Sequence, residues 1–115
     1  MNIKFYQKED GTEPALDFLY SLDPKMIAKM LRTIDLLEAN GTALRRPYSA
    51  YLEDGIFELR ASQGSNITRI LYFFIEGNTA YLTNGFTKKT QKTPRSEIEL
   101  AKAYRTDHLR RYPNE

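Results

Sequence analysis

The chain has 115 residues, of which 41% are hydrophobic and 28% are charged, and its formal net charge is +2. That much apolar material supports one folded domain over residues 1–115 and excludes a globally disordered chain. The lack of cysteine excludes disulfides and zinc–thiolate sites, and a single histidine, His108, excludes a His-rich metal site. No apolar run approaches the roughly 20 residues of a membrane span, and no signal peptide is visible, so we expect a cytoplasmic protein without a membrane partner.

The charge is unevenly distributed along the sequence. Residues 1–55 carry a net charge of −2, whereas residues 56–115 carry +4. An excess of lysine and arginine in the second half favours a polyanionic ligand near that half. A solvated helix face with ordinary surface lysines would give the same excess, so charge alone leaves both interpretations open.

The first third of the chain predicts a strand followed by two helices. Residues 2–7 alternate apolar and polar side chains, which is typical of a short edge strand. Thr12 is a candidate N-cap for a short helix. Asp23 and Pro24 then start a longer helix, in which apolar residues recur every three or four positions as far as Asn40. The short connection between the two helices predicts a helix hairpin.

Three strands are predicted in the middle of the chain, after an irregular segment at residues 42–55. Their side chains alternate between two faces or are continuously apolar, and they cover residues 56–60, 69–75 and 79–86. The second of them is apolar on both faces after its first residue, which indicates a central strand. Short turns between the strands predict an antiparallel meander.

A final helix is predicted to begin with Thr93 as N-cap and Pro94 as its first residue, and to end near Leu109. The resulting order, β-α-α-β-β-β-α, predicts an α+β fold with an N-terminal helix hairpin, an antiparallel sheet and a C-terminal helix. We expect the helices to cover one face of the sheet and to leave the other face for a ligand.

Charged residues cluster near the ends of the predicted strands. They are Glu58 and Arg60 in the first strand, Arg69 at the start of the second, and Lys88 and Lys89 after the third. Glu58 and Arg60 are two residues apart and therefore share a face. Four cations and one carboxylate suit a phosphate better than a metal ion, which needs clustered oxygen or imidazole ligands. A structural ion pair between Glu58 and Arg60 remains the alternative.

Several stretches of this region together resemble the RelE/ParE toxin superfamily. They are LEDGIFELR, RILYFF and GFTKKTQKTPRSEIELAKAY, which occur in this order between about Pro47 and Tyr104. They are most similar to the HigB-like branch, also described as phage-derived Gp49-like proteins. The resemblance implies a RelE-like fold, and the β-α-α order at the start of the chain agrees with it.

The resemblance implies the toxin of a type II toxin–antitoxin system. Such a toxin is an endoribonuclease that cleaves mRNA, generally on the ribosome, with the RNA 2′-OH as nucleophile and without a metal or other cofactor. By position, Arg60 and Arg69 match arginines that contact phosphate and stabilise charge in the transition state. Lys88 and Lys89 match a basic pair that contacts RNA or takes part in catalysis. Glu58 stands where some relatives have a basic residue, which leaves its catalytic role open.

Other candidates for RNA binding lie around these residues: Gln91, Lys92, Arg45, Arg46, Tyr72 and Phe86. The two adjacent arginines could reach a phosphate, remain surface charges or contact a protein partner. The two aromatic rings could stack on a base or pack in the core.

Some relatives use a histidine as general acid or base, and here only His108 is available, at the far end of the last helix. That histidine, a lysine, a tyrosine or Glu58 could transfer protons, or water and the ribosome could do so. We expect no strong dedicated base, and therefore slow cleavage of naked RNA, because electrostatics and substrate positioning would supply most of the rate.

The expected partner is a cognate antitoxin, typically a HigA-like helix-turn-helix protein that binds operator DNA, so that this chain meets DNA only indirectly. Two other classes of function stay open. One is a ParE-like inhibitor of DNA gyrase without nuclease chemistry, and the other is an inactive relative that acts as a regulatory binding module.

Overall fold

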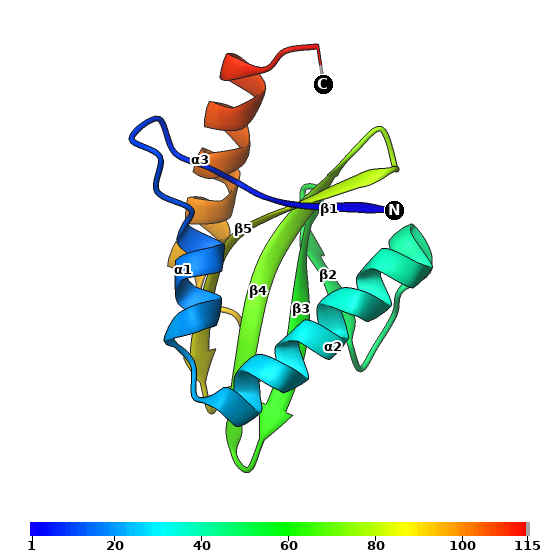
Figure 1. Ribbon diagram of the computed structural model, residues 1–115, viewed down its shortest axis with the longest axis vertical. Helices are drawn as coiled ribbons and strands as arrows, with labels where there is room; N and C mark the ends of the chain where they lie inside the picture. Colours follow the sequence, from blue (N-terminus) through cyan, green and yellow to red (C-terminus); the bar gives the residue numbers. More distant parts are fainter. Residues whose placement is uncertain (115) are drawn as a thin grey trace.

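The computed structural model describes residues 1–114. Its five strands form one sheet with the strand order β1-β5-β4-β3-β2 (Figure 1). The strands are β1 (Asn2–Phe5), β2 (Ser49–Glu53), β3 (Ile56–Gln63), β4 (Asn66–Ile75) and β5 (Thr79–Lys88). Strands β2 to β5 pair antiparallel in sequence order, and β1 pairs parallel with β5. The predicted α+β class and the expected RelE-like arrangement are confirmed, and β4 is the central strand.

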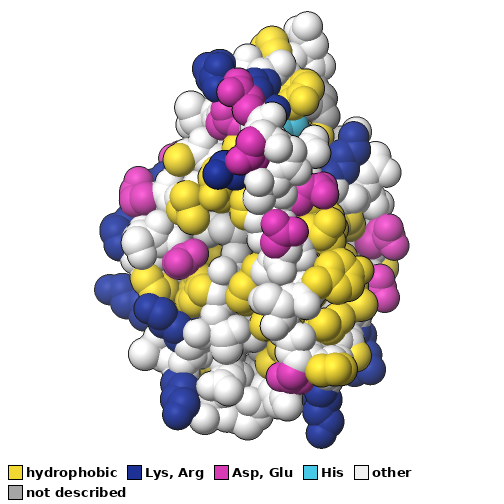
Figure 2. Space-filling view, turned by 60° about the vertical axis from the view of Figure 1, so that its left-hand side comes forward, with side chains coloured by type: hydrophobic (Ala, Val, Ile, Leu, Met, Phe, Trp, Pro, Cys, Tyr) yellow, Lys and Arg dark blue, Asp and Glu magenta, His cyan; other side chains and the backbone are white. Residues whose placement is uncertain are grey.

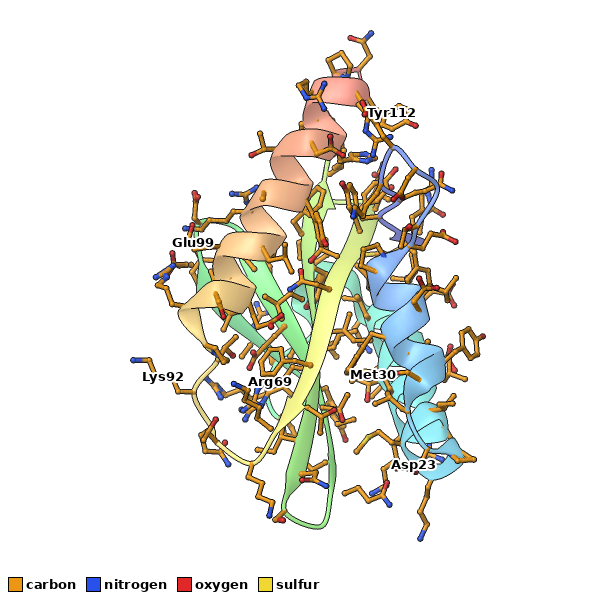
Figure 3. The ribbon with its side chains drawn as sticks, turned by 90° about the vertical axis from the view of Figure 1, so that its left-hand side faces the viewer. Asp23, Met30, Arg69, Lys92, Glu99 and Tyr112 are labelled. Atoms are coloured by element: carbon orange, nitrogen blue, oxygen red, sulfur yellow. The ribbon has the colours of Figure 1, made fainter. Side chains whose placement is uncertain are left out.

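Helices cover both faces of this sheet, so the prediction that one face would be free is wrong. The helices are α1 (Pro14–Ser21), α2 (Pro24–Asn40) and α3 (Arg95–Arg111), with a short 3-10 turn at Gly41–Ala43. Figure 3 shows the sheet between α3 on one side and α1 and α2 on the other. The central strands are apolar on both faces, so each face needs its own cover. No helix within residues 1–114 has both the length and the apolar character needed to cross a membrane.

Two hydrophobic clusters correspond to these two layers. Leu59, Ile70 and Leu82 pack beneath α1 and α2. On the opposite face, Leu71 and Phe73 belong to a cluster with Ile98 and Ala101 of α3. The alternation of side chains along β4 therefore assigns successive residues to the two clusters.

Local sequence signals explain most of the helix boundaries. The Asp23 side chain accepts a hydrogen bond of 3.0 Å from the Met26 backbone N–H, and Pro24 occupies the first turn of α2. The prediction that Thr12 is the N-cap of α1 is wrong. Glu13 holds that position, and the Thr12 N–H donates a hydrogen bond to the Asp10 carboxylate. The two helices are joined by a connection of only two residues.

The segment predicted to be irregular contains strand β2, which is the main error in the predicted element order. Ser49–Glu53 pairs antiparallel with the first residues of β3. The connection is the turn Asp54–Gly55, where both residues have positive φ, 50° and 78°. Asp-Gly is the dipeptide that tight hairpins of this kind prefer, because glycine adopts positive φ without steric cost.

Candidate functional site

The charged residues of β3 and β4 lie together on the sheet face that α3 covers. Arg60 of β3 is paired in register with Arg69 of β4, and Glu58 precedes Arg60 by two residues on the same face. Helix α3 starts only at Arg95, so the loop of residues 89–94 covers this end of the face. Figure 3 shows Arg69 inside the molecule and Lys92 pointing outward from that loop.

Glu58 is the shared counter-ion of two arginines. Its carboxylate lies 3.5 Å from Arg60 Nε and 3.7 Å from Arg69 Nε, and it accepts a hydrogen bond from the Thr93 hydroxyl. Only 2% of the residue is exposed. The expected pair between Glu58 and Arg60 is therefore present, and it extends into an Arg60–Glu58–Arg69 cluster.

Arg69 is fully buried, with 0% exposure, and cannot contact a ligand in this conformation. Its guanidinium donates hydrogen bonds to the backbone oxygens of Thr90 and Ile67, the latter at 3.4 Å, and lies 5.3 Å from the centroid of the Phe86 ring. Burial lowers the pKa of Arg69, and the neighbouring Glu58 carboxylate opposes that shift. Arg69 thus anchors the loop of residues 89–94 to the sheet.

Arg60 is the member of the cluster that reaches solvent. Its side chain is 15% exposed, and its Nη2 donates a 2.8 Å hydrogen bond to Gln91 Oε1. It lines a cleft of about 400 Å³ between β2 and the loop of residues 89–94. Arg46 and Lys92 line the same cleft, so cations enter it from three separate segments of the chain.

The cations around this cleft differ from those of α3 in their partners. Among the described residues, Arg46, Lys88, Lys89 and Lys92 have no carboxylate within 4.0 Å, whereas Arg95, Lys102, Arg105 and Arg111 of α3 each have at least one. Figure 2 shows the two signs mixed in the upper part of the molecule and a group of Lys and Arg side chains at the lower left, apart from the acidic ones. The cleft and its rim therefore carry positive charge that no neighbouring carboxylate among the described residues neutralises.

The remaining candidates lie in different places. Lys88 and Lys89 are exposed at the end of β5 and flank the cleft without lining it. Arg45 does not line it either, because its Nη1 donates to the backbone oxygens of Thr42 and Leu44 beside a different pocket. Of the two adjacent arginines that were candidates for phosphate binding, Arg46 therefore lines the cleft and Arg45 does not.

The candidate stacking rings are buried. Tyr72 is 1% exposed on the α1–α2 face, where burial raises its pKa and its hydroxyl lies 2.5 Å from that of Ser49. Phe86 is 8% exposed and packs beside Arg69. His108 is also remote, since it packs against Tyr81 with a ring-centroid distance of 4.1 Å near the end of α3. None of these three rings lines the cleft.

Thr93 is a member of the site that the sequence pattern placed elsewhere. It was expected to cap the last helix, but Pro94 is the N-cap and the Thr93 hydroxyl binds Glu58. No local signal identifies that bond, because the two residues are 35 positions apart. Within residues 1–114, no group of three His, Asp or Glu side chains is arranged to hold a metal ion.

The fold and the site define a RelE-like α+β protein with a cation-lined cleft over a buried arginine–glutamate cluster. Residues 17–106 match the family described as phage-derived protein Gp49-like (DUF891), and the chain belongs to that family. The family is RelE-like and is associated with the toxins of toxin–antitoxin systems, which have an antitoxin as their general partner. A comparison with curated proteins finds no match.

Proposed function

We propose that this protein is a HigB-like toxin of a type II toxin–antitoxin system and cleaves mRNA in the cytoplasm as a metal-independent endoribonuclease. The observation that carries the proposal is the cleft of about 400 Å³, in which Arg46, Arg60 and Lys92 converge. Among the described residues that line it, Glu58 is the only carboxylate, and it is buried and shared by two arginines. Such a cleft favours a phosphate group, because arginine and lysine remain available to it.

The proposed reaction is transesterification within the RNA. The 2′ oxygen attacks the adjacent phosphorus, the bond from phosphorus to the 5′ oxygen breaks, and the products are a 2′,3′-cyclic phosphate and a 5′-hydroxyl. The 2′-OH loses its proton to water, and the leaving 5′ oxygen takes a proton from water. Arg60 stabilises the charge that develops on the phosphoryl oxygens, and Lys92 holds the same group electrostatically.

The other residues are proposed to position these cations. Glu58 fixes the guanidinium of Arg60 through its 3.5 Å ion pair, and Arg69 holds Glu58 and the loop in place. Both oxygens of Glu58 already face cations or a hydroxyl, so we assign it no role as a general base. Lys88 and Lys89 would contact neighbouring phosphates from the rim of the cleft, and Gln91 would do so from its wall. Cleavage then depends on the ribosome to hold the mRNA in a reactive geometry.

A test of this proposal compares Arg60→Ala with Arg110→Ala after induction in cells. The matched control is Arg110, whose side chain is 64% exposed near the end of α3 and does not line the cleft. Loss of a cation that acts in the transition state is expected to slow cleavage by roughly 10²–10³-fold. Primer extension on cellular mRNA should show cuts within codons for the native chain and Arg110→Ala, and almost none for Arg60→Ala.

The same experiment separates the proposal from the other classes of function. Intact mRNA together with an SOS response would identify a gyrase inhibitor instead. Equal cleavage by Arg60→Ala and the native chain would contradict the proposed role of Arg60. We further propose that the antitoxin is a HigA-like helix-turn-helix protein, through which alone the toxin meets operator DNA.

A further inference from the structure

A second basic pocket lies beside the cleft, at the outer edge of β3. It has a volume of about 290 Å³ and is lined by residues of α2, of the segment before β2 and of β3, among them Lys29, Arg32, Tyr48, Arg60 and Ser62. Arg60 lines both this pocket and the cleft. A ligand that follows the surface past Arg60 would therefore pass from one into the other.

The edge of β3 is open at this pocket because β2 is short. Strand β2 pairs with β3 only from Ile56 to Leu59, and the Arg60 N–H then donates to the Tyr48 oxygen at 2.9 Å. Beyond Arg60, the Lys29 ammonium donates a 2.8 Å hydrogen bond to the Ser62 oxygen. An added strand would need that carbonyl group, so the lysine disfavours edge pairing by a protein segment.

The pocket combines positive charge with an exposed aromatic ring. Of the described residues that line it, none is acidic, and three are cations: Lys29, Arg32 and Arg60. Arg32 is exposed, with no carboxylate within 4.0 Å among residues 1–114. Tyr48 is 45% exposed, unlike the buried Tyr72 and Phe86. Single-stranded RNA is bound by this combination, because phosphates follow the cations and bases stack on open rings.

We propose that this pocket is a second RNA subsite, in which Lys29 and Arg32 bind the phosphates of nucleotides that flank the cleavage point and Tyr48 stacks on a base. The RNA strand enters the cleft, passes over Arg60 and continues along α2. This subsite rests on the proposed function, because it takes the same substrate as the cleft. It also supplies the stacking ring that neither Tyr72 nor Phe86 can offer from the core.

The test measures binding of the purified chain to fluorescently labelled single-stranded RNA by anisotropy, over a series of salt concentrations. An RNA of roughly ten nucleotides is long enough to span both pockets, whereas a dinucleotide occupies the cleft alone. The variants are Arg32→Glu and, as a control, Lys25→Glu. Lys25 is an exposed cation of the same helix and lines neither the pocket nor the cleft. Both variants replace a cation by glutamate, so they change the net charge equally.

Arg32→Glu is expected to weaken binding of the longer RNA by about tenfold or more and to reduce the salt dependence by about one phosphate contact. Binding of the dinucleotide should stay unchanged, and Lys25→Glu should resemble the native chain. Tyr48→Ala should weaken binding of the longer RNA by about tenfold, while Tyr48→Phe retains it, because stacking needs the ring and not the hydroxyl.

The outcomes separate this subsite from the function on which it rests. If the native chain binds RNA and Arg32→Glu binds the longer RNA as Lys25→Glu does, the subsite is overturned. The proposed function would then stand, and the pocket would be left to an acidic segment of a protein partner. If the native chain binds neither RNA and cuts no mRNA, the proposed function fails and the subsite fails with it.

Discussion

Glu58 shows at the scale of a single residue how the cleft depends on buried charge. The residue is 2% exposed, and its carboxylate is the only acidic group within 4.0 Å of the fully buried Arg69 among the described residues. Removing one partner of a buried ion pair leaves the other charge without compensation, which costs about 3–5 kcal/mol. We therefore expect Glu58→Gln to lower the free energy of unfolding by about that amount, as measured by urea denaturation.

The matched control for this change is Glu99→Gln on α3. Glu99 also faces an arginine, with 3.1 Å between its carboxylate and Arg95, but its side chain is 58% exposed. A solvent-exposed pair contributes at most about 1 kcal/mol, so this variant should unfold almost as the native chain does. Similar losses in Glu58→Gln and Glu99→Gln would show that Arg69 does not depend on its buried partner.

The sequence could predict which face these residues share, but not how deep each one lies. The two-residue period of a strand places Glu58 and Arg60 side by side, and the structure has them so. Period alone does not distinguish an arginine at the rim, such as Arg60, from one with no exposed surface, such as Arg69. That difference comes from the loop of residues 89–94, whose position is set by contacts with distant strands.

At the scale of whole elements, the errors of the prediction from sequence concern short elements and contacts between distant segments. Strand β2 has five residues and follows Pro47, so its own pattern is weak, and only its pairing with β3 makes it a strand. Helix α3 was predicted with nearly correct bounds, from Pro94 to about Leu109, against the observed Arg95–Arg111. Which face it would cover was not predictable from its modest apolar stripe, because that depends on how the chain returns after β5.

The contact between α1 and β5 explains a glycine in the middle of a strand. A Cβ added to Gly85 would lie 2.6 Å from Phe18 Cε2 and 2.8 Å from the Arg69 backbone oxygen. Neither distance is tolerable, so one of the neighbours would have to move. We expect Gly85→Ala to lower the free energy of unfolding by about 2–3 kcal/mol, measured by urea denaturation, because α1 would be pushed away from the sheet.

A second substitution tests whether Phe18 is the cause. In the Phe18→Leu background, which removes the ring that meets the new methyl group, Gly85→Ala should cost clearly less than it does in the native chain. The difference between the two costs is the coupling energy of the pair. Equal costs in both backgrounds would assign the strain to the Arg69 backbone instead of to helix α1.

At the scale of the whole molecule, a polar cluster joins the segment after β1 to the end of α3. The Tyr6 hydroxyl donates a 2.6 Å hydrogen bond to Asp107, and Arg111 donates to the same carboxylate at 2.9 Å. Tyr6 and Asp107 are 101 residues apart, so this contact holds together two segments near opposite ends of the chain. It also fixes the far end of the helix whose first turn lies beside the cleft.

This cluster predicts how stability changes with pH. The Tyr6 hydrogen bond and Arg111 lower the pKa of Asp107 from 3.8 to about 2, so its contribution is present above pH 3.8 and is lost as the pH falls through 2. Burial and Asp107 raise the pKa of Tyr6 from 10.0 to about 12, so its contribution is present below pH 10 and is lost as the pH rises through 12.

Tyr6→Phe should therefore change both ends of the stability profile. Near pH 7 it should lower the free energy of unfolding by about 2 kcal/mol, the usual effect of a hydrogen bond to a charged acceptor. Denaturant titrations should also show a weaker loss of stability between pH 3.8 and 2 and between pH 10 and 12 than in the native chain. Tyr20→Phe, on a tyrosine that is 63% exposed, should leave the profile unchanged. A profile for Tyr6→Phe that merely shifts down by a constant amount would show that the cluster contributes packing without proton linkage, because linkage requires the slope itself to change.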